Sequence, residues 1–196
     1  TSTSGSWADG SAAEGDGSSH IRLNGASDLD ALFGTEHAWA FTIQTTASDG
    51  TIIGVSESNG MWLNINLGAN SRSGRSAEAG EVLFTLRESS SGNVFTAEMD
   101  ATVNDGNPHR IVINKTGENT VDFYLDQRVQ SATIDDAQGS IDTSGELSTD
   151  PVLFASDDRP QDNAVEDYLT GVLDDVCAFN SALTTNEATS YSSPWE

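Results

Sequence analysis

The chain has 196 residues, which is enough for one domain with a full hydrophobic core. Its formal net charge is −23, from 31 Asp and Glu against 8 Lys and Arg, and Lys115 is the only lysine. Nucleic acids and anionic membrane surfaces attract cationic proteins and repel a chain this acidic, so the charge argues against both partners. No apolar run is long enough to span a bilayer, so membrane insertion is not expected.

The acidity is spread along the whole chain, and 36% of the residues are hydrophobic. This favours a folded domain with an acidic surface over a disordered chain. Lysine depletion with dispersed Asp and Glu resembles proteins of extreme halophiles, in which salt screens self-repulsion. We therefore expect a halophilic source, a haloarchaeal or haloarchaeal-virus surface protein; an ordinary acidic extracellular protein is the alternative. Cys177 is the only cysteine, which excludes an intrachain disulfide and predicts a small buried side chain.

In chain order, residues 1–19 are small, polar and Gly-rich, which predicts a flexible or loosely packed N-terminal arm anchored by Trp7. Residues 20–196 form the predicted domain, a series of short alternating apolar segments separated by Gly, Asn, Asp and Ser. Such segments are typical of half-buried strands in an all-β sandwich. Thr184 and Glu187 have capping-box spacing, which predicts a short helix after the last strand. The predicted strands cover residues 20–24, 39–45, 51–56, 61–67, 81–87, 94–99, 109–115, 121–126, 129–134, 152–156 and 168–179.

Two stretches carry a family resemblance. "VNDGNPHRIVINKTGENTVDFYLDQRV" (103–129) resembles the central hairpin of laminin-G-like domains, in the concanavalin A-like lectin/glucanase superfamily. "GVLDDVCAFNSALTTNEA" (171–188) resembles the closing strand and short helix of that family. Pro108 stands where the family usually has Trp, and Gln127 where it usually has Gly. The residues that match the hairpin are Asp105, Gly106, His109, Ile111 and Ile113 in its first half and Val121, Phe123, Tyr124, Leu125 and Asp126 in its second.

The resemblance covers about residues 20–191 and implies an all-β, concanavalin A-like jelly-roll sandwich of two antiparallel sheets with one short C-terminal helix. It also implies a structural Ca²⁺ with Asp174 as a ligand. Backbone carbonyls near Asn24 and Gly25, and the arm near Asp9, would complete the set, because Ca²⁺ takes six to eight oxygen ligands. The alternative is that Asp174 only accepts hydrogen bonds from a neighbouring turn. Asp175 is then expected to point the other way, into solvent.

Catalytic signals are weak. Glucanases of this superfamily carry E-x-D-x-x-E on one strand, and the nearest match is "EMDATV", in which Val103 takes the place of the acid/base after Glu98 and Asp100. Because retaining hydrolysis needs two carboxyl groups, we expect that the chain is not an enzyme. His109 matches a family position and is expected to pack and hydrogen-bond in the sandwich.

The sequence thus favours a non-catalytic recognition or adhesion module on a cell or virion surface, with a glycan or a surface protein as partner. One alternative is a structural decoration, spike or fibre subunit of a halophilic virus or cell-surface assembly. Its partners would be neighbouring subunits, as in a homo-oligomer. A glycoside hydrolase is the minor alternative. All of these place the protein outside the cell, on a cell surface or on a virion. Trp39 and Trp62 are expected in the core, and Trp195 is expected to anchor the C-terminal tail.

Overall fold

A computed structural model describes residues 2–3, 12–22, 36–56, 62–68, 77–88, 92–137, 151–158 and 164–192. Within these ranges the chain forms strands and one helix. Their bounds are Ser2–Thr3 (β1), Ala12–Asp16 (β2), Ile21–Arg22 (β3), Glu36–Gln44 (β4), Gly50–Ser56 (β5), Trp62–Leu67 (β6), Glu81–Arg87 (β7), Val94–Thr102 (β8), Pro108–Gly117 (β9), Thr120–Leu125 (β10), Arg128–Gln130 (β11), Ala132–Ala137 (β12), Val152–Leu153 (β13), Ser156–Asp158 (β14), Ala164–Glu166 (β15), Thr170–Phe179 (β16) and Thr185–Tyr191 (α1).

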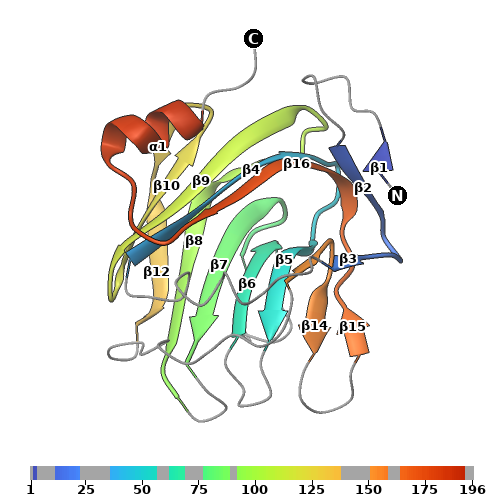
Figure 1. Cartoon of the computed structure of the whole chain (residues 1–196), viewed down its shortest axis with the longest axis horizontal. Helices are drawn as coiled ribbons and strands as arrows, with labels where there is room; N and C mark the ends of the chain where they lie inside the picture. The colour runs from blue at the N-terminus through green and yellow to red at the C-terminus, as the bar shows by residue number, and fades with distance from the viewer. Residues whose placement is uncertain are drawn as a thin grey trace.

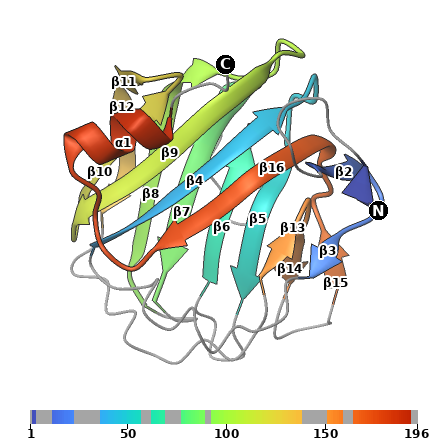
Figure 2. The ribbon, with the colours of Figure 1, turned by 45° about the horizontal axis from the view of Figure 1, so that its top comes forward.

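The strands build two antiparallel sheets of seven strands each, which pack face to face (Figure 1). The first sheet has the order β1-β2-β16-β4-β9-β10-β11, and the second has the order β12-β8-β7-β6-β5-β13-β3. β14 and β15 form a separate hairpin. Figure 2 shows the long strands β9, β4 and β16 side by side in front of the second sheet. The predicted fold class, two antiparallel sheets with one short C-terminal helix, is confirmed.

The core lies between the sheets and follows the alternation that the sequence shows. Trp39, Phe41 and Ile43 of β4 point inward and meet Phe84 and Phe95 of the second sheet in one buried cluster. Burying a side chain of this size is worth about 1.5–3 kcal/mol, so this layer carries much of the stability. Trp39 is in the core as predicted, and Trp62 is also buried but is not part of this cluster.

The C-terminal helix α1 lies on the outer face of the first sheet (Figure 1). The expected capping box is present, because Thr184 Oγ1 accepts from the Glu187 N–H and the Glu187 carboxylate accepts from the Thr184 N–H. Ala188 packs against Ala40, Val112 and Tyr124, which fixes the helix on the sheet. No helix in the described part of the chain is long and apolar enough to cross a membrane.

Three segments differ from the sequence expectations. Residues 129–134 were expected as one strand but form two, because the chain passes from the first sheet to the second at Ser131. Residues 152–156 are also divided, because Phe154 has a φ of 64° and turns the chain between β13 and β14. Within the expected loose arm of residues 1–19, β2 pairs with β16 as part of the first sheet, and Ala12 is fully buried.

A close approach explains why β2 contains Gly15. A Cβ at this position would lie 2.4 Å from Phe154 Cδ1 and 2.6 Å from the Leu169 carbonyl oxygen. Any side chain at residue 15 would therefore separate β2 from the segments beneath it. Trp7 and Trp195, the two tryptophans expected to anchor the ends, lie outside the residues that the structure describes.

Candidate functional site

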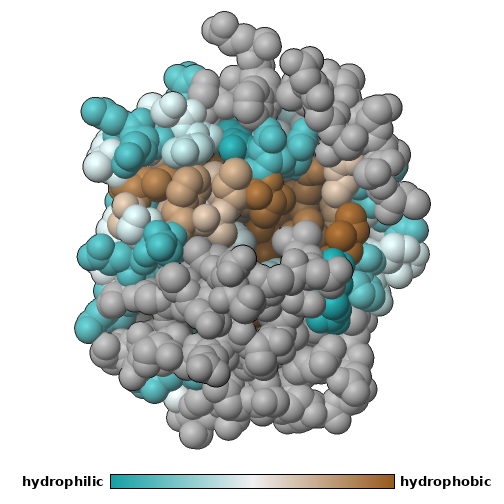
Figure 3. All heavy atoms as spheres, in the orientation of Figure 1, coloured by the Kyte–Doolittle hydropathy of each residue, from teal (hydrophilic) through white to brown (hydrophobic). Residues whose placement is uncertain are grey.

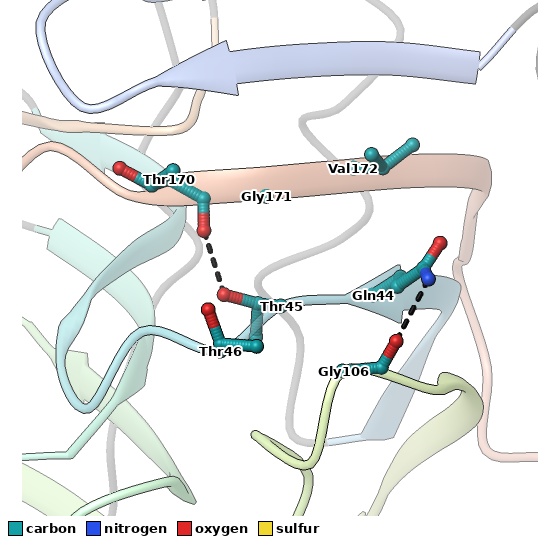
Figure 4. Close-up of a pocket in the computed structure, with 7 residues that line it drawn as sticks. All are labelled: Gln44, Thr45, Thr46, Gly106, Thr170, Gly171 and Val172. Carbon is teal, nitrogen blue, oxygen red and sulfur yellow. Dashed lines mark hydrogen bonds between the residues drawn. The ribbon is translucent and has the colours of Figure 1, made fainter.

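An open pocket of about 300 Å³ lies where the end of β4 meets the start of β16. Its walls come from residues 44–46 at the end of β4, residues 170–172 at the start of β16, and Gly106 in the loop before β9 (Figure 4). These segments are far apart in the sequence. The antiparallel pairing of β16 with β4 brings two of them together, and pairing of β4 with β9 brings the third.

Three hydrogen bonds tie these three segments to one another, and a fourth lies within residues 45–47. Thr45 Oγ1 donates to the Thr170 carbonyl (2.6 Å) and accepts from the Ala47 N–H (2.9 Å). Gln44 Nε2 donates to the Gly106 carbonyl (2.7 Å), and the Gly106 N–H donates to the Thr45 carbonyl (3.0 Å). Because both walls and the loop are bonded together, the pocket is formed before any ligand arrives.

Two glycines expose backbone to the pocket. Gly106 has a φ of 84°, a left-handed conformation that suits glycine. At Gly171 a Cβ would lie 2.8 Å from the Gln44 carbonyl oxygen and 3.0 Å from Thr45 Cβ, so no larger residue fits there. The surface that a ligand would meet therefore consists of peptide groups, hydroxyls and one amide, together with the apolar side chain of Val172.

None of the described residues that line the pocket is charged, but three carboxylates lie on neighbouring segments. On β2, Asp16 pairs in register with Thr170 and Glu14 with Val172, while Asp105 precedes Gly106 in the loop. Hydrogen bonds from the backbone and side chain of Ser18 lower the pKa of Asp16. The described residues include five basic side chains, and none of them lines the pocket: Arg22, Arg87, Arg110, Lys115 and Arg128.

The loop that supplies Gly106 is held by a histidine between two carboxylates. His109 Nδ1 lies 2.8 Å from Asp126 Oδ2, and its Nε2 lies 3.0 Å from Asp105 Oδ1. An ionised carboxylate only accepts hydrogen bonds, so both ring nitrogens must carry protons to satisfy this geometry. Burial favours neutral His109, but the hydrogen bonds to Asp126 and Asp105 outweigh it and raise the pKa of His109. The expectation that His109 packs and hydrogen-bonds is confirmed.

Asp105 has its own anchors in the loop. Its carboxylate accepts from the backbone N–H of Asn107 (2.8 Å) and from the Asn107 amide (2.9 Å). These bonds, followed by the one to His109, lower the pKa of Asp105 to about 2. Asp105 is therefore ionised at neutral pH and stays beside the pocket.

The "LDDV" pair lies at a bulge in β16, next to the buried guanidinium of Arg110. Asp174 Oδ1 accepts from the Asp175 N–H at 2.9 Å, and Asp175 has a φ of 48°. The Asp175 carbonyl accepts from Arg110 Nη1 at 3.2 Å, and its Oδ2 lies 3.8 Å from the same nitrogen, within reach of an ion pair. Asp175 is thus half-buried and faces Arg110, where the sequence led us to expect a solvated side chain.

Arg110 connects this bulge to two other elements. Its Nη1 donates to Thr42 Oγ1 on β4 (3.0 Å), and its Nε donates to the Tyr191 carbonyl at the end of α1 (2.6 Å). One buried side chain therefore joins β4, β16 and α1, which is a structural role.

The expected calcium set is represented in the described residues by Asp174 alone. Asp9, Asn24 and Gly25 lie outside those residues. Within the described ranges no three His, Cys, Asp or Glu side chains come together as a metal site. One carboxylate falls short of the six to eight oxygens that Ca²⁺ requires, so calcium binding stays a prediction.

A row of buried polar side chains crosses the second sheet, on the face opposite to the one that carries the core cluster. Asn64, Thr85 and Thr96 stand opposite one another on β6, β7 and β8, and all three are at most 1% exposed. Within the described structure, the Asn64 amide oxygen and nitrogen and both threonine hydroxyls have no hydrogen-bond partner. Buried polar atoms without partners are costly, so this row is a second place where water or a ligand could be held.

The remaining sequence candidates fall elsewhere. Glu98 and Asp100 lie on β8, whereas Val103 is fully buried in the core, so a carboxylate at this position would not face solvent beside them. Cys177 is partly exposed beside the small cluster under α1, although it was expected to be buried. Sequence reasoning missed the pocket and the polar row; the polar positions 64 and 66 in "WLNINL" were the only signal for the row.

Solved structures of other proteins share this architecture. The CBM40 of Ruminococcus gnavus IT-sialidase bound to α2,3-sialyllactose superposes with a TM-score of 0.70 at 13% identity, over 92% of this chain and 96% of that one. The fold is a concanavalin A-like jelly roll. The same module bound to α2,6-sialyllactose gives a TM-score of 0.66 at 14% identity, covering 92% of this chain and 97% of the other.

Laminin G domains share the jelly roll. The LG1-3 region of the laminin α2 chain gives a TM-score of 0.61 at 10% identity, and the match covers 89% of this chain and 32% of that one. Mouse laminin α1 domains LG4-5 give 0.54 at 11% identity, over 89% of this chain and 44% of the other. No family model and no curated protein matches the sequence. At these identities the likeness establishes the fold alone.

Proposed function

We propose that this jelly roll is a non-catalytic recognition or adhesion module that binds a glycan through the pocket between β4 and β16, on a cell or virion surface. The observation that carries the proposal is the preformed pocket of neutral hydrogen-bonding groups at the end of these strands. Sugars present hydroxyls that both donate and accept, and lectin-like sites meet them with the same kinds of groups.

The pocket offers what such a ligand needs. The Gln44 amide and the hydroxyls of Thr46 and Thr170 supply donors and acceptors, while Val172 gives an apolar contact for the C–H face of a sugar ring. Gly106 presents its backbone at the pocket without a side chain. Similarity in fold to a module solved with bound sialyllactose supports this function class.

The surface charge supports an extracellular, high-salt setting for this function. The only lysine, Lys115, is 1% exposed and lies over the Phe95 ring, so the surface carries no lysine ammonium group. An acidic surface of this kind keeps a protein soluble where salt screens its self-repulsion. We include a halophilic source in the proposal on this ground.

A glycan array probed in molar KCl tests the function. The wild-type protein should bind a defined subset of glycans, and Thr46→Trp should abolish this binding because an indole at this exposed position fills the pocket. Thr133→Trp, on the exposed edge strand β12, is the matched control and should bind as wild type does. Absence of any array signal, or equal binding by Thr46→Trp, would overturn the proposal.

Exposed apolar residues on two edge strands favour a second candidate, a subunit of a surface assembly. Val129 on β11 is 62% exposed and Ile134 on β12 is 41% exposed, at adjoining edges of the two sheets. Edge strands are ready sites for pairing with another chain. Analytical ultracentrifugation in molar KCl should show an oligomer that Val129→Ser with Ile134→Ser dissociates; a monomer at all concentrations would contradict this candidate.

A further inference from the structure

We infer that the pocket between β4 and β16 selects an uncharged, hydroxyl-rich saccharide and rejects the sialylated glycans that its structural neighbours were solved with. This inference rests on the proposed function and names the ligand class for the same pocket. It follows from the charges in and around the pocket.

Among the described residues no Lys or Arg side chain lines the pocket, and the His109 ring beside it is held by Asp105 and Asp126. Sialic acid carries a carboxylate that is ionised at neutral pH, and a cationic donor such as a guanidinium binds it more strongly than neutral donors do. The described pocket lining offers only neutral donors: one amide, three hydroxyls and backbone N–H groups. A carboxylate that leaves water for this pocket therefore gains less from its partners than it would beside a cation.

Arg110, the described arginine closest to the pocket in sequence and register, already has hydrogen-bond partners within the protein. Arg110 lies on β9 opposite Thr42, two residues before Gln44. Its side chain is 5% exposed and bonded to Thr42, to the Tyr191 carbonyl and to the Asp175 carbonyl. Turning it toward a ligand would leave these groups unpaired, so Arg110 is no substitute for a ligand-binding arginine.

The rim of the pocket carries negative charge. Asp16 and Glu14 of β2 pair in register with Thr170 and Val172, whereas the charge of Asp105, next to Gly106, is offset by His109. The Asp16 carboxylate accepts hydrogen bonds from the backbone N–H groups of Ser18 and Ser19, and such bonds lower its pKa and keep it ionised. Like charges at this range suppress anionic partners, and the net charge of −23 adds a repulsive field around the whole chain.

Binding of a neutral saccharide remains favourable in this pocket. A neutral sugar brings no charge that must be desolvated against these carboxylates. Its hydroxyls can donate to the Gln44 side-chain oxygen and to exposed carbonyls, and can accept from the hydroxyls of Thr46 and Thr170. The same rim that rejects an anion can accept hydrogen bonds from sugar hydroxyls.

Matched glycans that differ only in sialylation test the inference, with lactose and 3′-sialyllactose as one pair on an array of such pairs. At low salt the neutral member should bind at least about tenfold more tightly, because electrostatic repulsion is least screened there. The ratio should shrink in molar KCl as screening increases. Tighter binding of the sialylated members by the wild type would overturn the inference and leave glycan recognition standing.

A charge introduced in the pocket supplies the second arm. Thr46→Arg should reverse the preference toward the sialylated members, because it places a guanidinium at the exposed pocket wall. Thr133→Arg adds the same charge on β12 and should leave the preference unchanged. If both variants shift the preference equally, the pocket is not the site and the inference fails. If no glycan binds to any of the three proteins, the proposed function fails, and this inference with it.

Discussion

Asp126 and Gln127 form the turn between β10 and β11, and both have positive φ, 49° and 68°. The left-handed conformation costs a non-glycine residue roughly 1–2 kcal/mol, and Asp tolerates it better than Gln does. The Gln127 N–H donates to the Ser192 carbonyl, so the turn also holds the end of α1. The sequence marks this position as a departure from the Asp-Gly turn of laminin-G-like domains.

Replacing Gln127 with Gly should stabilise the protein. The gain should be about 0.5–1 kcal/mol, because relief of left-handed strain exceeds the greater chain entropy of glycine. Urea unfolding measures it, and Gln127→Ala is the control that retains the strain. A glycine variant that unfolds at or below the wild-type midpoint would show that the turn is not strained.

Asp174 of the "LDDV" pair is either a Ca²⁺ ligand or only a hydrogen-bond acceptor within the protein. In the structure its carboxylate accepts from the Asp175 N–H, and Asn at this position could do the same with its amide oxygen. Because Asp174→Asn can keep this hydrogen bond, the calcium prediction is tested by the effect of added Ca²⁺ on stability. Calcium at about 100 times its dissociation constant should add about 2.7 kcal/mol of stability to the wild type and much less to Asp174→Asn. Melting curves in calcium and in chelator that coincide for the wild type would refute the metal.

At the scale of elements, His109 joins the loop before β9 to the turn after β10. Its pKa is raised above the ordinary value, so the stability it contributes is complete below the unfolded pKa and is lost as pH rises through the folded pKa. Neutral imidazole has one N–H for two carboxylates, which is the physical reason for the loss.

The wild type should have a larger free energy of unfolding than His109→Gln, and this difference should be largest at mildly acidic pH. It should decrease as the pH rises above 6.5 and through the raised pKa of His109. Gln can donate to one carboxylate at every pH, so its own contribution does not titrate. A constant difference from pH 5 to pH 9 would rule out the imidazolium clamp.

Most strands could be predicted from the alternation of apolar and polar residues, because successive side chains of a strand point to opposite faces of its sheet. Residues 81–87 were expected and found as one strand, because apolar positions at every second residue leave a single register. β2 could not be predicted, since "AAEGD" has no such pattern and its pairing depends on β16 far along the chain. The division at Phe154 was also hidden, because a left-handed phenylalanine is dictated by tertiary contacts.

The pocket could not be predicted either, for a related reason. Gln44, Thr46 and Thr170 are uncharged residues from distant segments, and no spacing rule connects them. Only the registers of β4 with β9 and β16 place them together. The "DG" of the hairpin motif did point to the loop that carries Gly106, although as a sign of the fold and not of a site.

At the scale of the whole molecule, the acidic surface should make stability depend on salt. In Figure 3 hydrophilic residues border a band of hydrophobic residues across one face. The Debye length falls from about 10 Å at 0.1 M salt to about 3 Å at 1 M, which removes most repulsion between surface carboxylates.

The melting temperature should therefore rise as KCl increases from low to molar concentration. A variant with Asp49→Asn and Asp122→Asn, two exposed acids, should require less salt for the same melting temperature. A melting temperature that does not change between low and molar KCl would contradict the proposal of a halophilic source.

Amide chemical-shift mapping tests most directly whether the pocket between β4 and β16 binds a glycan. The wild-type protein would be titrated with the neutral saccharide that the array selects, in molar KCl. We predict that the largest shift changes occur at the amides of Thr46, Gly106 and Gly171. Changes that cluster instead around Asn64 and Thr85 on the second sheet would contradict the account and place the glycan on the buried polar row.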